Sequence, residues 1–377
     1  MKKERMLFIG IIIILLGIIV ITNIDKETTK ELNEEKKISS KGMFAIMVQD
    51  GNNGYVESTS NSWPEDMYLN KELTNCVDSS GNKVENVVSY EDGNIVINSK
   101  KNVFCYIYFY QSIGDYLLKN NASITSLNDN IEGGMYRYQG TYETVTNNYV
   151  CFGTSDKDEC LENTDAHIYR IIGITEDGRL KMLKNYALES TKQWYNSHTS
   201  DITWPNSDSF SAINGEAFYT NTVYMPSGWS DKIETIDWKY GNITNINVNA
   251  TSLYNAESAW SNTINAKIGL IYVYDYYYAY QSGGLNCSDS SSYSKCKNAW
   301  IHLSVCDSSA SSKIEWTISR YGMTSGGYSD TWYVNSDGAV NHYSQYFSNS
   351  VRPTFFLKSD IEFLGGTGTF DNPYLIK

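Results

Sequence analysis

Residues 168–184 read IYRIIGI-TEDG-RLKMLK, two runs rich in β-branched and long apolar residues on either side of a Glu-Asp-Gly turn. Such a turn between two β-prone runs predicts a β-hairpin. Downstream, four more stretches have the composition of strands: AKIGLIYVYDYYYAY (266–280), IEWTIS (314–319), TWYVNSDGAVNHY (331–343) and VRPTFFLKS (351–359). Between the hairpin and the first of these stretches, residues 210–218 and 231–238 space their apolar side chains as helices do. A hairpin, then helices, then several strands predict an α+β domain with its helices against one antiparallel sheet.

Upstream of the hairpin, residues 43–110 alternate short apolar runs with turns. The runs FAIMV, NIVINS and VFCYIYFY predict strands, and turn sequences such as SSGNK and EDGN separate them. We therefore expect a small all-β module over 43–110. The next residues, 111–134, predict a helix around 113–118 and then a linker.

The N-terminus combines a basic head with an unbroken apolar run. Lys2, Lys3 and Arg5 precede the run, which extends from Met6 to Ile21 and, with its flanks, is long enough for a hydrocarbon core of about 30 Å. Because basic residues stay in the cytoplasm, we expect a transmembrane anchor over 1–24, with the N-terminus cytoplasmic and the bulk of the chain extracellular. A cleaved signal peptide is the alternative, but small residues for a cleavage site are missing directly after the run.

Composition limits the class of protein. The chain has 377 residues, of which 14% are aromatic and 19% charged, and its formal net charge is −13. Many aromatics with few charges exclude a mostly disordered protein. The acidic balance argues against a nucleic-acid partner, because phosphate binding needs basic patches. Residues 25–42 differ from the rest in being charged and nearly free of apolar side chains, which predicts a solvated stalk.

Seven cysteines follow the apolar run, and in an exported chain thiols this numerous indicate disulfides. We expect three local pairs: Cys76 with Cys105, Cys151 with Cys160, and Cys287 with Cys296. The remaining Cys306 is then a spare or intermolecular thiol. A zinc site is not indicated, since the sequence has no CxxC motif and its four histidines are scattered.

No catalytic motif stands out, so we expect no catalytic residues, no enzyme activity and no cofactor. The cluster YDYYYAY (274–280) offers Tyr276 and Tyr278 as contacts for a glycan or protein, if a strand exposes them. Trp332, Asn335 and Asp337 form a second candidate ligand site, whose oxygens suit calcium. An Asn/Asp β-turn produces the same pattern without a metal.

A series of segments in the second half carries a resemblance to a known family. The segments are YRIIGI (169–174), GWSDKIETIDW (228–238), AKIGLIYVYDYYYA (266–279), WTISR (316–320), YVNSDGAV (333–340), SVRPTFFLKSD (350–360) and GGTGTFDNPYLI (365–376). The series resembles an uncharacterised C-terminal domain of exported, often pilin-like or single-pass proteins of low-GC Gram-positive bacteria. It is remotely similar to the C-type-lectin-like fold of the formylglycine-generating-enzyme superfamily. The resemblance implies a C-type-lectin-like domain over 135–377.

The chain departs from that superfamily at its functional positions. It has no counterpart to the paired active-site cysteines that hold copper in the sulfatase-modifying enzymes. It also lacks the Glu-Pro-Asn and Gln-Pro-Asp signatures of calcium-dependent lectins. Arg352, in SVRPTF, is expected to be structural, with a buried carboxylate or carbonyl as its partner.

These features predict a single-pass bacterial cell-surface protein that displays an adhesin-like ectodomain. Its expected partners are the membrane, through the N-terminal helix, and a surface glycan or protein. Two alternatives remain: a structural component of an envelope or pilus-like assembly, and an enzyme of unknown reaction. Polar residues converging in a deep cleft would favour the enzyme.

Overall fold

The computed structural model describes residues 38–40, 42–50, 54–91, 93–120, 124–126, 135–142, 146–221, 223–280 and 286–377. The expected anchor (1–24) and most of the expected stalk (25–42) lie outside these residues. Within them, no helix has both the length and the apolar character needed to cross a membrane. The chain divides into two compact units: one holds the described residues up to 48 with 56–65 and 69–109, and the other those of 49–55, 66–68 and 110–377.

The first unit is built on two mixed sheets. One has the order β3-β2-β9-β5-β6, with β4 also paired to β9, and the other has the order β1-β8-β7. The strands of these sheets are β1 (Ile38–Ser40), β2 (Met43–Gln49), β3 (Tyr55–Glu57), β4 (Met67–Leu69), β5 (Asn75–Asp78), β6 (Lys83–Val84), β7 (Val88–Glu91), β8 (Asn94–Ile97) and β9 (Val103–Gln111). The division assigns Gln49, Tyr55, Met67, Tyr68, Tyr110 and Gln111 to the second unit. The pairs β2–β9 and β1–β8 are parallel. Alternate residues of β9 are buried, as a strand with one face on a core requires.

The second unit contains a seven-stranded sheet. Its order is β10 (Ile124–Ser126), β11 (Tyr136–Tyr138), β13 (Ile168–Ile174), β14 (Leu180–Lys184), β23 (Thr354–Leu357) and β18 (Ile268–Gly269), with β12 (Tyr149–Cys151) also paired to β13. These pairs are antiparallel. β13 and β14 form the hairpin predicted from IYRIIGI-TEDG-RLKMLK, and both strands are buried along their whole length.

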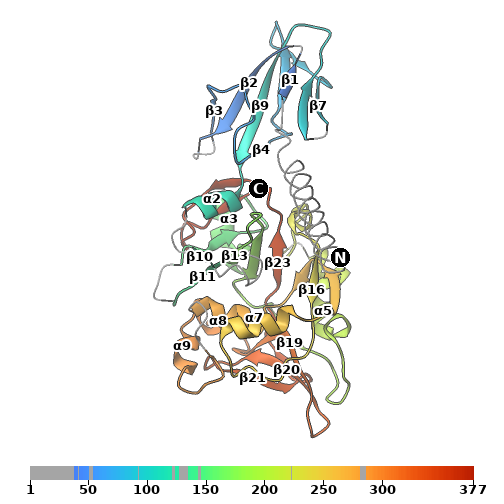
Figure 1. Ribbon diagram of the computed structural model, residues 1–377, viewed down its shortest axis with the longest axis vertical. Coiled ribbons are helices and arrows are strands. Elements are labelled where there is room, and N and C mark those ends of the chain that lie inside the picture. The colour runs from blue at the N-terminus through green and yellow to red at the C-terminus, as the bar shows by residue number, and fades with distance from the viewer. Residues whose placement is uncertain are drawn as a thin grey trace, which may run out of the picture. The chain divides into compact units, whose positions relative to one another are not determined.

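Smaller sheets and short helices complete this unit (Figure 1). The sheets are β19-β20-β21 (Glu315–Met323, Ser329–Val334, Val340–Ser344), β15-β22 (Lys192–Gln193, Ser348–Asn349), β16-β17 (Ile236–Lys239, Thr263–Ala266) and β24-β25 (Phe363–Gly365, Leu375–Ile376). The α-helices are α2 (Ile113–Asn120), α3 (Lys157–Glu162), α4 (Thr164–His167), α5 (Asp208–Asn214), α6 (Glu216–Tyr219), α7 (Ala250–Ser258), α8 (Val273–Tyr280), α9 (Tyr293–Lys297) and α10 (Leu303–Cys306). Two 3-10 helices, η1 (Trp204–Asn206) and η2 (Trp229–Lys232), lie between them.

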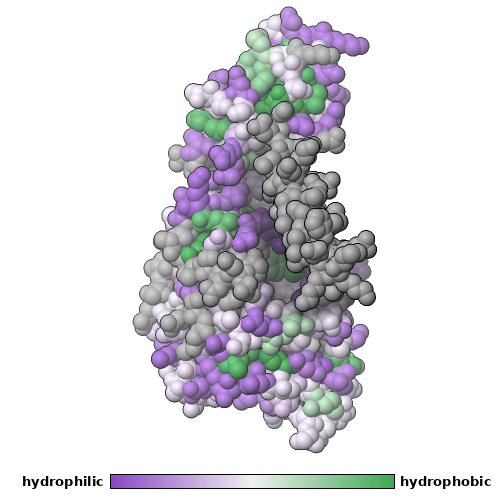
Figure 2. Space-filling model, viewed as in Figure 1, coloured by the Kyte–Doolittle hydropathy of each residue, from purple (hydrophilic) through white to green (hydrophobic). Residues whose placement is uncertain are grey.

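Local sequence explains where several helices begin. The side chains of Asp156, Ser207 and Asn249 each accept a hydrogen bond from a backbone N–H in the first turn of α3, α5 and α7. Such caps satisfy donors that a helix leaves unpaired. The helices pack on a core rich in aromatic residues, in which Trp194, Trp204, Trp238, Trp300 and Trp316 are fully buried. On the face shown in Figure 2, hydrophobic residues gather only in small groups among hydrophilic ones.

This architecture corrects the predicted fold class. We expected an N-terminal transmembrane helix, a small all-β module and a C-type-lectin-like α+β domain with one antiparallel sheet. The described residues instead form a mixed α/β structure divided among seven sheets, including parallel pairs in the first unit. The prediction was wrong because many strands are only two to four residues long and pair locally, so they do not join one continuous sheet.

Three disulfides are present, joining Cys76 to Cys105, Cys151 to Cys160, and Cys287 to Cys296. They are the pairs expected from the spacing of the cysteines. Cys76 and Cys105 are direct partners across the antiparallel strands β5 and β9, while each of the other two bridges closes a nine-residue separation. Three disulfides fit an extracellular or otherwise oxidising environment.

Candidate functional site

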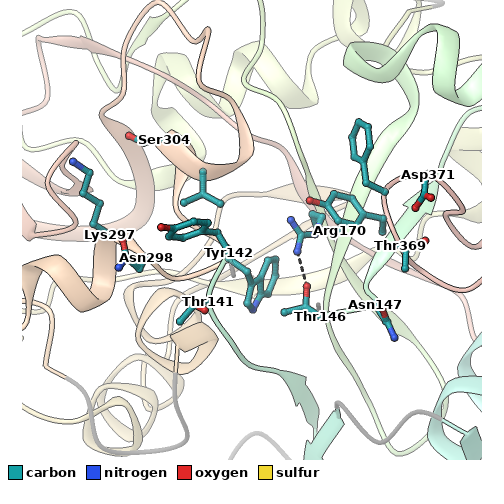
Figure 3. Close-up of a pocket in the computed structure, with 14 residues that line it drawn as sticks. Thr141, Tyr142, Thr146, Asn147, Arg170, Lys297, Asn298, Ser304, Thr369 and Asp371 are labelled. Carbon is teal, nitrogen blue, oxygen red and sulfur yellow. Dashed lines mark hydrogen bonds between the residues drawn. The ribbon is translucent and has the colours of Figure 1, made fainter. Parts of the chain in front are cut away.

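The second unit contains a cavity of about 780 Å³ whose lining is aromatic and polar (Figure 3). Its volume lies within the range of small-molecule and cofactor sites. We call it the aromatic pocket. Its lining residues are Thr141, Tyr142, Thr146, Asn147, Tyr149, Arg170, Lys297, Asn298, Trp300, Ser304, Val305, Thr369, Phe370 and Asp371.

The floor of the aromatic pocket comes from the paired strands β12 and β13. Tyr149 and Arg170 are direct partners in this antiparallel pair, so their side chains leave the same face of the sheet. The Arg170 guanidinium lies 3.8 Å from the centroid of the Tyr149 ring and 4.7 Å from that of Trp300. These cation–π contacts hold the guanidinium between two aromatic rings.

A second wall forms where the segment after β11 meets the segment after α9. The Tyr142 N–H donates to the Asn298 carbonyl, and the Trp300 N–H donates to the Gly140 carbonyl. The indole N–H of Trp300 donates in turn to the Tyr138 carbonyl at 3.2 Å. Trp300 is therefore a rigid, buried element of the wall, whereas Tyr142 is 55% exposed at the mouth.

The turn between β24 and β25 provides the third wall. The Tyr149 N–H donates to the Gly368 carbonyl, and the Phe370 ring meets the Tyr149 ring edge-on at 5.4 Å. Gly368 has a positive φ of 74°, and a Cβ there would lie 2.3 Å from the Asn147 carbonyl oxygen. Only glycine permits this close approach, which brings Phe370 and Asp371 to the cavity.

Arg170 is the buried charge of the site. It is 2% exposed, its Nε donates to the Asn148 side chain at 2.7 Å, and its Nη2 donates to the Thr146 hydroxyl at 2.8 Å. Burial lowers the pKa of Arg170 below its ordinary value. In the described part of the chain no carboxylate lies within ion-pair distance of it, so its contacts are hydroxyl, amide and aromatic groups.

A second cavity of about 270 Å³ is lined by Lys181 and Glu257 among aromatic residues. Burial lowers the pKa of Lys181 to about 8 and raises that of Glu257 to about 8. Lys181 contacts both carboxylate oxygens of Asp275 at 2.9 Å, and Arg137 donates to the same carboxylate at 2.8 Å. Against the effect of burial, these two cations hold the pKa of Asp275 below its ordinary value. This network pairs its charges internally, as a structural core does.

The structure places the predicted contacts Tyr276 and Tyr278 in the core. Both lie on helix α8, not on a strand, and both are 1% exposed. The Tyr276 hydroxyl donates to the Cys296 carbonyl at 2.9 Å, and the Tyr278 hydroxyl donates to the Thr251 hydroxyl at 3.2 Å. A ligand cannot reach these side chains at the surface.

The second predicted group lies around the β20–β21 turn and does not join the pocket. Trp332 is 4% exposed, and its indole N–H donates to the Ile243 carbonyl. The Asn335 side chain accepts from the Ser336 N–H, and that of Asp337 accepts from the Ala339 N–H. These are the bonds of an Asn/Asp β-turn. Among the residues that the structure describes, no three His, Cys, Asp or Glu side chains are grouped so as to hold a metal ion.

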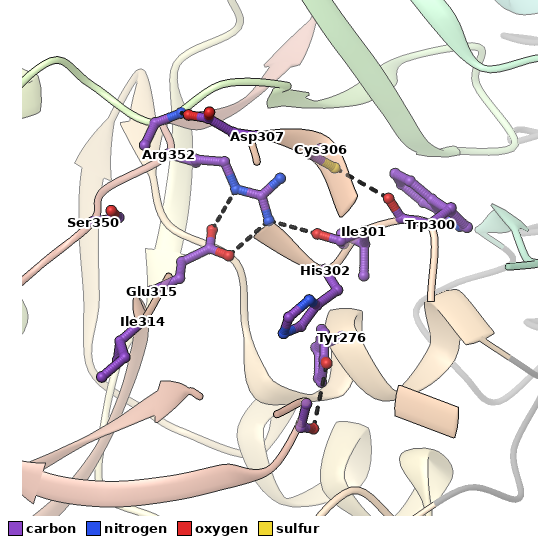
Figure 4. Close-up of polar contacts among 12 residues, drawn as sticks. Tyr276, Trp300, Ile301, His302, Cys306, Asp307, Ile314, Glu315, Ser350 and Arg352 are labelled. Carbon is purple, nitrogen blue, oxygen red and sulfur yellow. Dashed lines mark hydrogen bonds and ion pairs between the residues drawn. The ribbon is translucent and has the colours of Figure 1, made fainter. Parts of the chain in front are cut away.

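Arg352 is fully buried and pairs with a carboxylate and a carbonyl, the partners expected from the sequence (Figure 4). Its Nε and Nη2 donate to the two carboxylate oxygens of Glu315 at 2.8 and 2.6 Å, and Nη2 also donates to the Ile301 carbonyl. The free thiol Cys306 is buried nearby and donates to the Trp300 carbonyl at 3.1 Å. Arg352 and Cys306 thus lie behind the wall that carries Trp300.

Sequence reasoning missed the aromatic pocket, because its residues come from six separate segments of the chain: 141–142, 146–149, 170, 297–300, 304–305 and 369–371. One signal was available: Arg170 is the only charged residue in IYRIIGI, a run whose every residue is buried. A charge in such a run requires a special environment. Comparison with protein-family models, curated proteins and solved structures finds no match for this chain.

Proposed function

We propose that this protein binds carbohydrate in the aromatic pocket, and that it does so outside the cell as an adhesin-like protein. The observation that carries the proposal is the combination of aromatic faces with amide and hydroxyl groups around one open cavity. A sugar ring has an apolar C–H face that suits an aromatic ring and a rim of hydroxyls that need hydrogen-bond partners. Tyr142 and Phe370, which are 55% and 43% exposed, offer the faces.

Polar side chains of the pocket lining also support carbohydrate binding. Asn147 and Asn298 can both donate and accept hydrogen bonds, and Thr141 and Thr369 add hydroxyls. A site that pairs with ligand hydroxyls discriminates strongly against ligands that lack them. The three disulfides support a location outside the cytoplasm, where a surface glycan is accessible.

The lining favours binding over hydrolysis. Most glycoside hydrolases use two carboxyl groups on either side of the scissile bond. Among the described residues that line the pocket, Asp371 is the only carboxylate, and it is exposed. We therefore propose a binding protein that releases its ligand unchanged.

The test is a glycan array with the full chain, followed by titration calorimetry on the ligands that bind. Tyr142→Ala removes an exposed aromatic face and is expected to weaken binding about three- to tenfold. Tyr343→Ala is the matched control, because Tyr343 is 53% exposed, against 55% for Tyr142, and lies on β21 outside the pocket. An array without binding, or equal loss in both variants, would overturn the proposal.

A further inference from the structure

We propose that the ligand of the aromatic pocket is an acidic saccharide whose carboxylate pairs with Arg170. This inference rests on the proposed carbohydrate-binding function and adds the chemical class of the sugar. It starts from a comparison of Arg170 with the other arginines of the chain.

The structure describes five arginines, and four of them contact a carboxylate. Their pairs are Arg137 with Asp275, Arg179 with Asp177, Arg320 with Asp201, and Arg352 with Glu315. Arg170 alone has no such partner among the described residues, although it is 2% exposed. A charge buried at this depth without an ionised partner is costly. Two of the five arginines line a cavity: Arg170 lines the aromatic pocket and Arg179 the second cavity, but Arg179 has a carboxylate partner in Asp177.

The contacts of Arg170 are all with neutral groups. Nε and Nη2 donate to the side chains of Asn148 and Thr146, and the guanidinium also forms a hydrogen bond with the Tyr149 side chain. Figure 3 shows the guanidinium in the middle of the lining residues, with its bond to Thr146 dashed. Because Tyr149 and Trp300 hold the guanidinium between them, its orientation is fixed before the ligand binds. An ionised acceptor forms the strongest hydrogen bond with such a donor.

A second cation strengthens the preference for an anion. Lys297, at the end of α9, is exposed at the rim of the pocket, and Figure 3 shows it on the side opposite Asp371. The protein as a whole has a formal net charge of −13, so two cations beside one cavity are a local departure from its acidic character. The lining thus combines cations with aromatic rings. An acidic sugar can contact both, with its carboxylate on Arg170 and its ring against the aromatic walls.

The experiment compares matched sugars by titration calorimetry with the full chain. The pairs are sialyllactose with lactose, and trigalacturonate with its methyl ester, which keeps the rings but removes the charges. We expect the acid of at least one pair to bind tenfold or more tightly than its neutral counterpart. We also expect this preference to shrink as the salt concentration rises from 50 to 500 mM.

Two variants separate Arg170 from general electrostatics. Arg170→Gln is expected to abolish the preference for the acid while weak binding of the neutral sugar remains. If that variant does not fold, Lys297→Gln, which changes an exposed residue, is expected to reduce the preference several-fold. Lys295→Gln is its control, since Lys295 is exposed on the same helix but does not line the pocket.

The outcomes distinguish the two proposals. Equal affinity for acid and neutral sugars, or a preference that Lys297→Gln leaves intact in the absence of a folded Arg170 variant, overturns the assignment of an acidic ligand but leaves carbohydrate binding standing. Absence of binding by every sugar on the array and in these pairs overturns the proposed function, and the acidic ligand with it.

Discussion

The side chain of Glu257 is a carboxyl group that is fully buried in the core of the second unit. It accepts hydrogen bonds from the Ser319 hydroxyl and from the Tyr274 N–H, the latter at 3.1 Å. Burial raises its pKa from 4.5 to about 8, which outweighs the opposite effect of these bonds. The folded state therefore binds more protons than the unfolded state between pH 4.5 and 8. The contribution of Glu257 to stability is complete below pH 4.5 and is lost as the pH rises towards 8.

Glu257→Gln is expected to remove this pH dependence. Relative to the variant, the wild-type free energy of unfolding should fall by up to about 1.4 kcal/mol per pH unit between pH 5 and 8. Urea denaturation at a series of pH values measures the difference. Glu216→Gln is the control, because Glu216 is exposed on α6. Parallel wild-type and Glu257→Gln curves across this range would contradict the raised pKa.

Arg170 shows what a single sequence can and cannot reveal about a residue. A charged residue inside an apolar run is unusual, yet the other residues of this run are those of an ordinary buried strand. The residues around Arg170 in the sequence do not identify Trp300 as the second ring against its guanidinium, because Trp300 lies far away along the chain. Local patterns indicate burial, but the partners of a buried charge depend on tertiary structure.

Helix α8 shows the same limit at the scale of an element. The run from Val273 to Tyr280 is rich in tyrosine, which favours strands, and we expected a strand over 266–280. The structure has the short strand β18 and then a helix in which seven of eight residues are buried. A helix buried on nearly every side has no amphipathic period to detect. The prediction of helix over 231–238 was also wrong, since η2 and the strand β16 occupy that stretch.

Elements with a clear local signal were predicted correctly. The hairpin of β13 and β14 has a Glu-Asp-Gly turn, and Gly178 adopts the positive φ of 82° that such a turn requires. Helix α2 was expected around 113–118, and the structure has it at Ile113–Asn120. The sequence gives no sign that these two elements touch, although the Gly114 backbone lies directly on the turn at Gly178.

Gly114→Ala tests this contact. Within a helix, alanine normally stabilises relative to glycine by up to about 1 kcal/mol. Here the new Cβ would lie 2.0 Å from the Gly178 carbonyl oxygen, so α2 must move from the hairpin. We expect the free energy of unfolding to fall by about 1–3 kcal/mol, measured by urea denaturation. Lys119→Ala, at an exposed position of α2, should change it by less than about 0.5 kcal/mol. A stabilised Gly114→Ala protein would show that the two elements are not in contact.

At the scale of the whole molecule, the cysteines divide between the two compact units. The bridge between Cys76 and Cys105 belongs to the first unit, and the other two bridges belong to the second. Each unit also has its own buried residues: Ile46, Ile95 and Ile107 lie in the first, while the tryptophan-rich core lies in the second. Units with separate cores can unfold in separate steps. The aromatic pocket draws every lining residue from the second unit.

Replacing Cys76 and Cys105 by alanine should therefore destabilise the first unit alone. The bridge closes a sequence separation of 29 residues, for which chain entropy gives a loss of about 3–4 kcal/mol. Scanning calorimetry should show one transition shifted to lower temperature, with saccharide binding retained. The matched control replaces Cys287 and Cys296, whose separation of 9 residues predicts a loss of about 2–3 kcal/mol in the other transition. If both double variants shift a single common transition, the two units unfold as one and their bridges stabilise the protein jointly.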